Sequence, residues 1–193
     1  MESGLHSSYS EPVPKSSQKV PMPDVPIMKQ AIEALHSVLP ASSSVFLCGG
    51  TVRDLLGGGI PHDFDIVLRP TDFERVKTGF ISKLRDLQKE KQWRIVVRSH
   101  RTITLSSGAV EGSQLYMVKL GGDSDTIGKD GKPKTIDLEI DFREMKFNST
   151  YGEPMSMKQL LEADIKTRDF TVNSLYCDTK DMLLIDFKGG NYR

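Results

Sequence analysis

Apolar residues recur with helical spacing in three stretches of the chain, and this pattern predicts three amphipathic helices. Between residues 26 and 39 the apolar positions lie three or four residues apart, which places them on one face of a helix. The same spacing is found in 71–89 and in 156–165. Capping-box patterns open the second and third stretches, at 71–74 and 156–159, and mark where these helices are predicted to begin.

Short apolar and β-branched runs lie between these helices and are predicted to be strands. The runs are 45–48, 63–68, 93–97, 102–105, 115–120, 136–142, 176–177 and 183–187. Turn residues separate the third, fourth and fifth runs, and also the last two, as is typical of antiparallel neighbours. The segment 121–134 is polar and rich in glycine, so it is predicted to be a mobile loop.

The first 25 residues differ in composition from the rest of the chain. They are rich in serine and proline, and they resemble neither a secretory signal nor a transit peptide. We predict a disordered tail over 1–25. The whole chain of 193 residues is long enough for one domain with a substantial core and short for two, so one folded domain over 26–193 is expected.

Composition narrows the classes of function. The 26 basic and 26 acidic residues balance, so the totals do not indicate a strongly basic surface for long nucleic acid. Cys48 and Cys177 lie in separate apolar runs, which favours buried free thiols in a reducing compartment over a disulfide. We expect a cytoplasmic protein, with a mitochondrial or other organellar location left open. No apolar run approaches transmembrane length, so no membrane partner is expected.

Two carboxylates in the run 63–68 are the first candidate functional groups. Side chains at alternate positions of a strand point to the same face, so Asp63 and Asp65 are predicted to lie side by side. Two like charges at this spacing repel each other unless a cation binds them. Hard oxygen ligands suit Mg²⁺, which takes one or two carboxylates and completes its shell with water and phosphate oxygens.

A glycine turn precedes these carboxylates. Gly49 and Gly50 let the backbone approach a ligand closely, and the helix predicted over 51–56 directs unpaired N–H groups at it. A lone Gly-Gly is most often a tight turn, and a lone Asp-x-Asp is most often a solvated strand end. Their combination in the order strand, turn, helix, loop and strand predicts a site for a nucleoside triphosphate with its metal.

These residues resemble the signature of a known family. Gly49-Gly50-Thr51-Val52-Arg53-Asp54, Gly58 and Asp63-Phe64-Asp65 are similar to the head domain of class II (bacterial-type) tRNA nucleotidyltransferases and poly(A) polymerases. That family belongs to the DNA polymerase β-like nucleotidyltransferase superfamily. Gly57 stands where the family usually has a second leucine. The resemblance places Arg53 with Gly49 and Gly50 among the nucleotide-binding residues.

A second stretch, 167–175, also resembles the family. It reads Thr-Arg-Asp-Phe-Thr-Val-Asn-Ser-Leu, and the resemblance implies that Arg168, Asp169 and Asn173 contribute to nucleotide and ribose recognition. Arginine binds triphosphate oxygens in a forked, charge-assisted way. A salt bridge between Arg168 and Asp169 is the alternative. Thr167 replaces the first arginine of the family, so one phosphate or RNA contact is expected to be weaker.

The third carboxylate of the site is expected in the run 136–142, where acidic and apolar residues alternate strictly. Most such strands simply have a wet outer face. The family carries an acid followed by Arg-Glu on this strand, which resembles Asp137 followed by Arg143 and Glu144. Asp137 is therefore predicted as the third catalytic and metal-binding residue beside Asp63 and Asp65, with Glu139 and Asp141 as alternatives.

The resemblance implies an α+β fold with a mixed, largely antiparallel sheet and flanking helices. It further implies transfer of AMP or CMP from ATP or CTP to an RNA 3′ end, in tRNA CCA addition or polyadenylation, by a two-metal mechanism with Mg²⁺. The family's helical neck, body and tail domains do not occur in these residues, so we expect the catalytic head of a longer protein. The alternative is a catalytically inactive relative that binds nucleotide or serves as a structural subunit.

Overall fold

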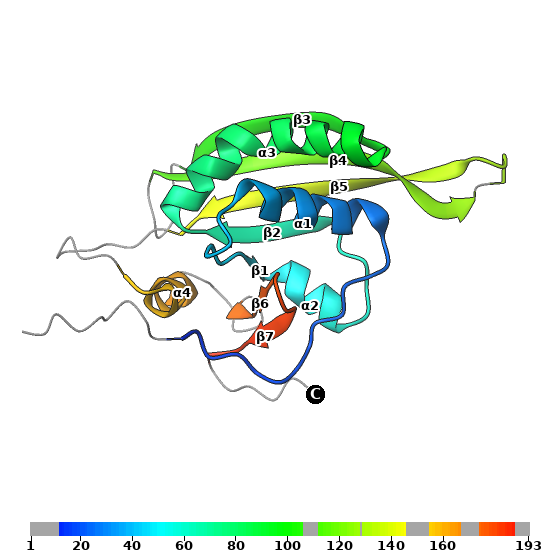
Figure 1. The fold of residues 1–193 in the computed structure, drawn as a ribbon. Coiled ribbons are helices and arrows are strands. Elements are labelled where there is room, and N and C mark those ends of the chain that lie inside the picture. The colour runs from blue at the N-terminus through cyan, green and yellow to red at the C-terminus, as the bar shows by residue number, and fades with distance from the viewer. Residues whose placement is uncertain (1–11, 106–111, 128, 146–154, 167–173, 188–193) are drawn as a thin grey trace, which may run out of the picture.

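The computed structural model describes residues 12–105, 112–127, 129–145, 155–166 and 174–187 of the chain (Figure 1). Its helices are α1 (Pro26–Val38), α2 (Gly50–Leu56), α3 (Pro70–Lys91) and α4 (Met157–Lys166). Its strands are β1 (Phe46–Cys48), β2 (Asp63–Leu68), β3 (Ile95–Leu105), β4 (Ser113–Ile127), β5 (Pro133–Glu144), β6 (Tyr176–Asp178) and β7 (Leu183–Ile185).

The strands form one sheet in the order β3-β4-β5-β2-β1-β6-β7. Strands β2 and β5 pair in parallel, and every other pair among the described strands is antiparallel. The expected α+β fold with a mixed, largely antiparallel sheet is therefore confirmed. The parallel pair lies in the middle of the sheet, and α3, β3 and β4 form the connection between its two strands.

Helices α1 and α3 cover one face of the sheet and enclose the larger core (Figure 1). The apolar stripe of α3 is buried, as its spacing predicted. Phe80 of that stripe packs edge to face against Phe142 of β5, with 5.1 Å between the ring centroids. Burying each such side chain stabilises the fold by about 2 kcal/mol.

The opposite face of the sheet is only partly covered. Helix α4 packs there against β1, β6 and β7 in a second, smaller core that includes Phe46 and Tyr176. On the same face of β3, β4 and β5, alternate residues such as Arg98, Lys119 and Asp137 are at least half exposed. We call this uncovered part of the sheet the open face. It is continuous with the face of β2 that carries Asp63 and Asp65.

Two sequence expectations about loops and strands were wrong. The segment 121–134 is not a loop, because β4 continues to Ile127 and β5 begins at Pro133, so most of the segment lies in a long hairpin. Its backbone pairing outweighs its polar, glycine-rich composition. Residues 95–97 of the first run and the whole run 102–105 belong to a single strand, β3, whose pairing register with β4 shifts between Val97 and Ser99.

Helix starts were predicted with mixed success. The capping box at Ser156 is confirmed, since the Gln159 N–H donates to Ser156 Oγ at 3.2 Å and the Ser156 N–H donates to Gln159 Oε1 at 2.8 Å. The capping box at 71–74 does not form. Helix α3 begins at Pro70, one residue earlier, and has no side-chain cap. Proline favours the first helical position because it has no N–H to satisfy.

The described part of the expected disordered tail is ordered near β7. The Ser16 N–H donates to Leu184 O at 2.8 Å, and the Leu184 N–H donates to Gln18 O at 2.9 Å. Val20 and Val25 are buried in the larger core. Residues 16–25 are therefore ordered, contrary to the predicted disorder over 1–25. Residues 1–11 lie outside the described residues.

Candidate active site

The site is built around the N-terminal half of β2. Phe64 and Ile66 of this strand are buried under α1 and α3, which turns Asp63 and Asp65 to the opposite face. Asp63 is exposed and Asp65 is partly buried. The predicted carboxylate pair is therefore present, and it faces the side of the sheet that those helices leave uncovered.

The glycine turn lies beside this pair. Because β1 runs antiparallel to β2, the end of β1 and the turn after it reach the N-terminal half of β2. Gly49 has φ +61° and ψ −132°, a combination that essentially only glycine adopts without strain. Strand pairing thus brings the glycine motif and the carboxylate motif of the sequence together.

Thr51 ties the turn to the carboxylate strand, a role that the sequence analysis did not assign. Its buried hydroxyl accepts the N–H of Asp65 at 2.8 Å and donates to the carbonyl oxygen of Asp63 at 3.2 Å. These two bonds satisfy backbone groups that β1 does not reach and fix α2 against β2. A hydroxyl next to a Gly-Gly turn was the available signal.

Arg53 lies over the glycine turn. A Cβ atom at Gly50 would stand 3.4 Å from Arg53 Nη2, so the glycine leaves room for the guanidinium. The side chain is half exposed and bonds the neighbouring Asp54 carboxylate at 2.9 Å. Helix α2 has only seven residues, so its dipole is weak, and among the described residues Arg53 adds a positive charge at this turn.

Strand β5 brings further carboxylates to the pair from the other side. The parallel register places Glu139 opposite Asp63 and Asp141 opposite Asp65. Neighbouring strands are about 4.8 Å apart, so the four acids form two adjacent rows on the face opposite α1 and α3. Lys119 of β4 pairs with Glu139 at 2.8 Å and partly offsets their charge.

Asp141 has the most perturbed carboxyl group of this cluster. Burial raises the pKa of Asp141 to about 6, and the charges of Glu139, Asp65 and Asp63 add to the rise. Its Oδ1 atom is buried, and no described residue forms a hydrogen bond with it. A buried acceptor without a donor is costly, so this oxygen is poised for a cation.

The structure does not bring Asp137 to the carboxylate pair. Asp137 lies two residues before the partner of Asp63, beyond the start of β2, and its side chain is 80% exposed. Its carboxylate is 3.8 Å from Arg98 Nε. The register brings the two alternatives, Glu139 and Asp141, beside the pair, and leaves Asp137 farther away.

Three residues of the second signature, Arg168, Asp169 and Asn173, lie outside the described residues. The chain is described again from residue 174, where Leu175 O accepts the N–H of Gly49 at 3.3 Å. The end of the second signature thus adjoins the glycine turn of the first.

A buried polar cluster holds the elements on either side of the second signature. Asp164 of α4 accepts hydrogen bonds from Arg143 of β5 at 3.1 and 3.2 Å and from the Tyr176 hydroxyl at 2.6 Å. Asp164 and Tyr176 are buried. The sequence analysis did not identify this cluster, because its members lie on three different elements, β5, α4 and β6.

The donor set suits a divalent cation that keeps other ligands. Within the described ranges, no three His, Cys, Asp or Glu side chains are already gathered closely enough to hold a metal alone. Mg²⁺ does not require such a cage, since it usually binds one or two carboxylates together with water and substrate phosphates. The orphaned Asp141 oxygen beside Asp65 fits that mode.

Helices long and apolar enough to cross a bilayer do not occur in the part of the chain that the structure describes. Cys48 and Cys177 are both buried and neither is in a disulfide, as predicted. Burial raises the pKa of the Cys177 thiol to about 12, so this thiol is unreactive.

The chain is similar to known proteins over most of its length. The chain is 28% identical over 181 residues to poly(A) polymerase I of Salmonella typhi, covering 92% of this chain and 33% of that protein. It is 26% identical over 161 residues to the CCA-adding enzyme of Streptococcus pyogenes serotype M2, covering 83% of this chain and 32% of that protein. The chain thus spans about a third of the length of these relatives.

Solved structures of similar proteins include a CCA-adding enzyme in complex with ATP, at 21% identity and a TM-score of 0.46, covering 85% of this chain and 30% of that chain. The Thermotoga maritima CCA-adding enzyme complexed with tRNA has 19% identity and a TM-score of 0.40, and the match covers 85% of this chain and 29% of that chain. The family model described as the poly(A) polymerase head domain matches residues 45–192. That match includes both signatures and every element of the site, and the chain belongs to this family of nucleotidyltransferase head domains.

Proposed function

We propose that this chain is the catalytic head of an RNA nucleotidyltransferase. It transfers AMP or CMP from ATP or CTP to the 3′ hydroxyl of an RNA, in tRNA CCA addition or in polyadenylation. The main observation in support is that Asp65 and Asp141 lie opposite each other beside the Gly49-Gly50 turn. The buried Oδ1 atom of Asp141 receives no hydrogen bond from the described residues. The relatives are named as poly(A) polymerase and CCA-adding enzyme, which supports the reaction class.

Nucleotidyltransferases of this family generally use a divalent metal, and we propose Mg²⁺ held by Asp63, Asp65 and Asp141. When bound, the cation lowers the pKa of the attacking hydroxyl and offsets charge on the leaving pyrophosphate. Asp141 takes the place that the sequence analysis gave to Asp137. The protein's part is to hold these carboxylates on two rigid, paired strands.

The nucleotide lies on the β1 side of the carboxylates in this proposal. Gly49 and Gly50 allow close approach of its phosphates, and Arg53 contributes positive charge over the turn. The Thr51 hydroxyl keeps the turn and the carboxylate strand in register. Arg168, Asp169 and Asn173 complete nucleotide recognition in this assignment, which rests on their sequence alone.

The transfer is a single displacement at phosphorus. The 3′ oxygen of the RNA forms a bond to the α-phosphorus while the bond from that phosphorus to the bridging oxygen of the β-phosphate breaks. The hydroxyl proton leaves to a carboxylate or to water, and pyrophosphate departs with the electron pair of the broken bond. In this proposal, other domains of a longer protein bind the part of the RNA that lies away from its 3′ end. The two buried thiols fit a cytoplasmic location.

Titration calorimetry with ATP and CTP, with and without Mg²⁺, tests this proposal on the wild-type chain and on the double variant Asp63→Ala/Asp65→Ala. We expect metal-dependent binding that the double variant loses. Asp86→Ala/Glu90→Ala removes the same charge from the exposed face of α3 and is expected to bind like the wild type. A folded wild-type chain that binds neither nucleotide would contradict the proposal and favour the inactive, structural alternative.

A further inference from the structure

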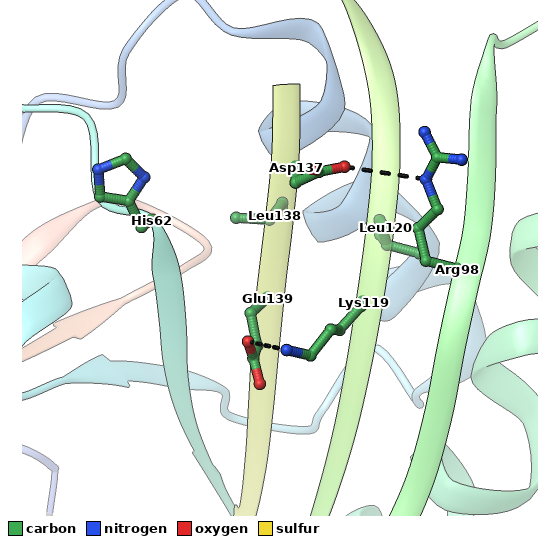
Figure 2. Close-up of a pocket in the computed structure, with 7 residues that line it drawn as sticks. All are labelled: His62, Arg98, Lys119, Leu120, Asp137, Leu138 and Glu139. Carbon is green, nitrogen blue, oxygen red and sulfur yellow. Dashed lines mark ion pairs between the residues drawn. The ribbon is translucent and has the colours of Figure 1, made fainter. Parts of the chain in front are cut away.

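A pocket on the open face adjoins the candidate active site but contains none of the nucleotide-binding residues. Its volume is about 440 Å³, and it is lined by His62, Arg98, Lys119, Leu120, Asp137, Leu138 and Glu139 (Figure 2). It is contiguous with the carboxylate cluster, because Glu139 is paired with Asp63 and its N–H donates to the carbonyl oxygen of His62 at 3.2 Å.

Two features of the backbone direct Arg98 into this pocket. The register of β3 against β4 shifts at Arg98, and such bulges re-aim a side chain. Arg98 then crosses β4 over Gly121, where a Cβ atom would stand only 2.6 Å from Arg98 Nε. Figure 2 shows Arg98 extending from β3 toward β4, and its ion pair with Asp137 of β5 is drawn across β4. An arginine that simply points into solvent from a strand would require neither a bulge to redirect its side chain nor a glycine to make room for it.

The two cations of the pocket are paired with acids at different degrees of exposure. Arg98 is 53% exposed and lies 3.8 Å from Asp137, which is 80% exposed, whereas Lys119 is 53% exposed and pairs at 2.8 Å with Glu139, which is 29% exposed. An ion pair as exposed as Arg98–Asp137 contributes little to stability, so Arg98 exchanges its carboxylate for a phosphate at low cost, and the half-exposed Lys119 adds a second positive charge. Both point from neighbouring strands to the same side of the sheet (Figure 2).

The position of the pocket identifies which substrate it suits. It lies on the β5 and β4 side of the carboxylates, whereas the glycine turn lies on the β1 side. In a displacement at phosphorus, the attacking and leaving oxygens are on opposite sides of the phosphorus atom. If the nucleotide occupies the glycine side, the strand that attacks must come from the side of the pocket.

We propose that this pocket binds the phosphodiester next to the 3′ end of the acceptor RNA, with Arg98 and Lys119 as its phosphate-binding residues. The inference rests on the proposed function and adds the path of the acceptor strand. Arg98 and Lys119 hold the last phosphate, and the terminal ribose extends from it toward Asp63 and Asp141.

The test measures affinity for a short single-stranded RNA with a free 3′ hydroxyl, by fluorescence anisotropy over a series of salt concentrations. Arg98→Gln and Lys119→Gln are each expected to weaken binding and to reduce the log–log salt slope by roughly 0.7, the value for one lost phosphate contact on a single strand. Arg85→Gln removes one charge from the exposed side of α3 and serves as the matched control, with no change expected.

Gly121→Ala provides a test that keeps every charge. The added methyl group displaces the flexible end of Arg98, not the backbone, so the chain is expected to fold and to bind RNA as weakly as Arg98→Gln. Unchanged RNA affinity in all three variants would overturn the inference. So would a loss of ATP affinity with RNA affinity intact, because the pocket would then belong to the triphosphate.

Nucleotide binding by the same variants separates this inference from the proposed function. Arg98→Gln and Gly121→Ala are expected to bind ATP with Mg²⁺ as the wild type does, whereas Asp63→Ala/Asp65→Ala loses that binding. If ATP binding fails in the wild type, the proposed function fails. If ATP binds and only the RNA predictions fail, the acceptor path alone is wrong.

Discussion

Asp141 of β5 lies directly opposite Asp65 of β2 in the parallel pair at the middle of the sheet. The two carboxylates come from strands separated by α3, β3 and β4, and no local sequence pattern relates them. Their proximity is unfavourable in the metal-free chain, because burial and the charges of Glu139, Asp65 and Asp63 all disfavour ionisation of Asp141. A bound cation would offset this cost, which is why we propose a metal at this position.

Asp141→Asn should stabilise the metal-free chain near neutral pH. Because the pKa of Asp141 is raised from 3.8 to about 6, the folded state binds its proton more tightly than the unfolded state does. Ionised Asp141 therefore destabilises the folded wild type above pH 6. This loss of stability is recovered as the pH falls from about 6 toward 3.8 and the carboxyl group takes up its proton. The gain in Asp141→Asn at pH 7.5 is about 1 kcal/mol after allowance for solvent screening, or about 3 °C in Tm.

Thermal unfolding at pH 5 and pH 7.5 checks this prediction. Added Mg²⁺ should raise the Tm of the wild type and raise that of Asp141→Asn much less, because ligands that bind the folded state stabilise it. Asp137→Asn is the comparison variant and should keep the Mg²⁺ response of the wild type. A normal Mg²⁺ response in Asp141→Asn and a lost one in Asp137→Asn would restore Asp137 as the third ligand.

Thr51→Val should destabilise the chain by about 2 kcal/mol, although its shape is preserved. The substitution leaves the Asp65 N–H and the Asp63 carbonyl without their side-chain partner. Urea denaturation measures the loss. Thr51→Ser keeps the hydroxyl and should recover most of the stability, and a large loss in Thr51→Ser as well would point to packing of the methyl group instead.

Gly49→Ala should cost about 2 kcal/mol of stability, since its backbone lies in a region that side chains tolerate poorly. Gly131, in the turn between β4 and β5, also has positive φ (+75°) and open space around it, so Gly131→Ala is the matched control for backbone strain. Both variants should unfold at lower urea concentration. Only Gly49→Ala should lose affinity for ATP with Mg²⁺, and equal affinity in the two variants would remove Gly49 from the nucleotide site.

Tyr176→Phe should destabilise the chain by about 2 kcal/mol, because it removes a hydrogen bond to a buried carboxylate. Tyr116→Phe is the control: Tyr116 is also buried, and the described residues provide no hydrogen bond to its hydroxyl. That control should stay within about 0.5 kcal/mol of the wild type. Similar losses in both variants would mean that the Asp164 cluster contributes no more than ring packing.

Local patterns predicted the faces of strands well and their relative register poorly. Alternation showed that the acids of 136–142 share one face, and it correctly placed Asp63 and Asp65 together. The offset between β5 and β2 depends on the long connection between them, so the strand pattern alone could not choose among Asp137, Glu139 and Asp141. Composition likewise failed for 121–134, where pairing with a neighbouring strand decided the structure.

Contacts between distant segments were also beyond prediction. Thr51 and the Asp164 cluster act through hydrogen bonds to groups elsewhere in the chain, and their residue types carry no periodic signal. By contrast, the burial of the α3 stripe and the proximity of the glycine turn to Asp63 followed from patterns within a few tens of residues.

The parallel pairing of β2 with β5 has a consequence for how the chain folds. Parallel neighbours require a long crossover, and contacts of large sequence separation form slowly because their loop must close first. The hairpin of β3 and β4 and the helix α3 are local structures that can form early. We therefore expect Asp65 and Asp141 to come together among the last steps of folding, so that a nascent or partly folded chain does not form this carboxylate pair ahead of its global structure.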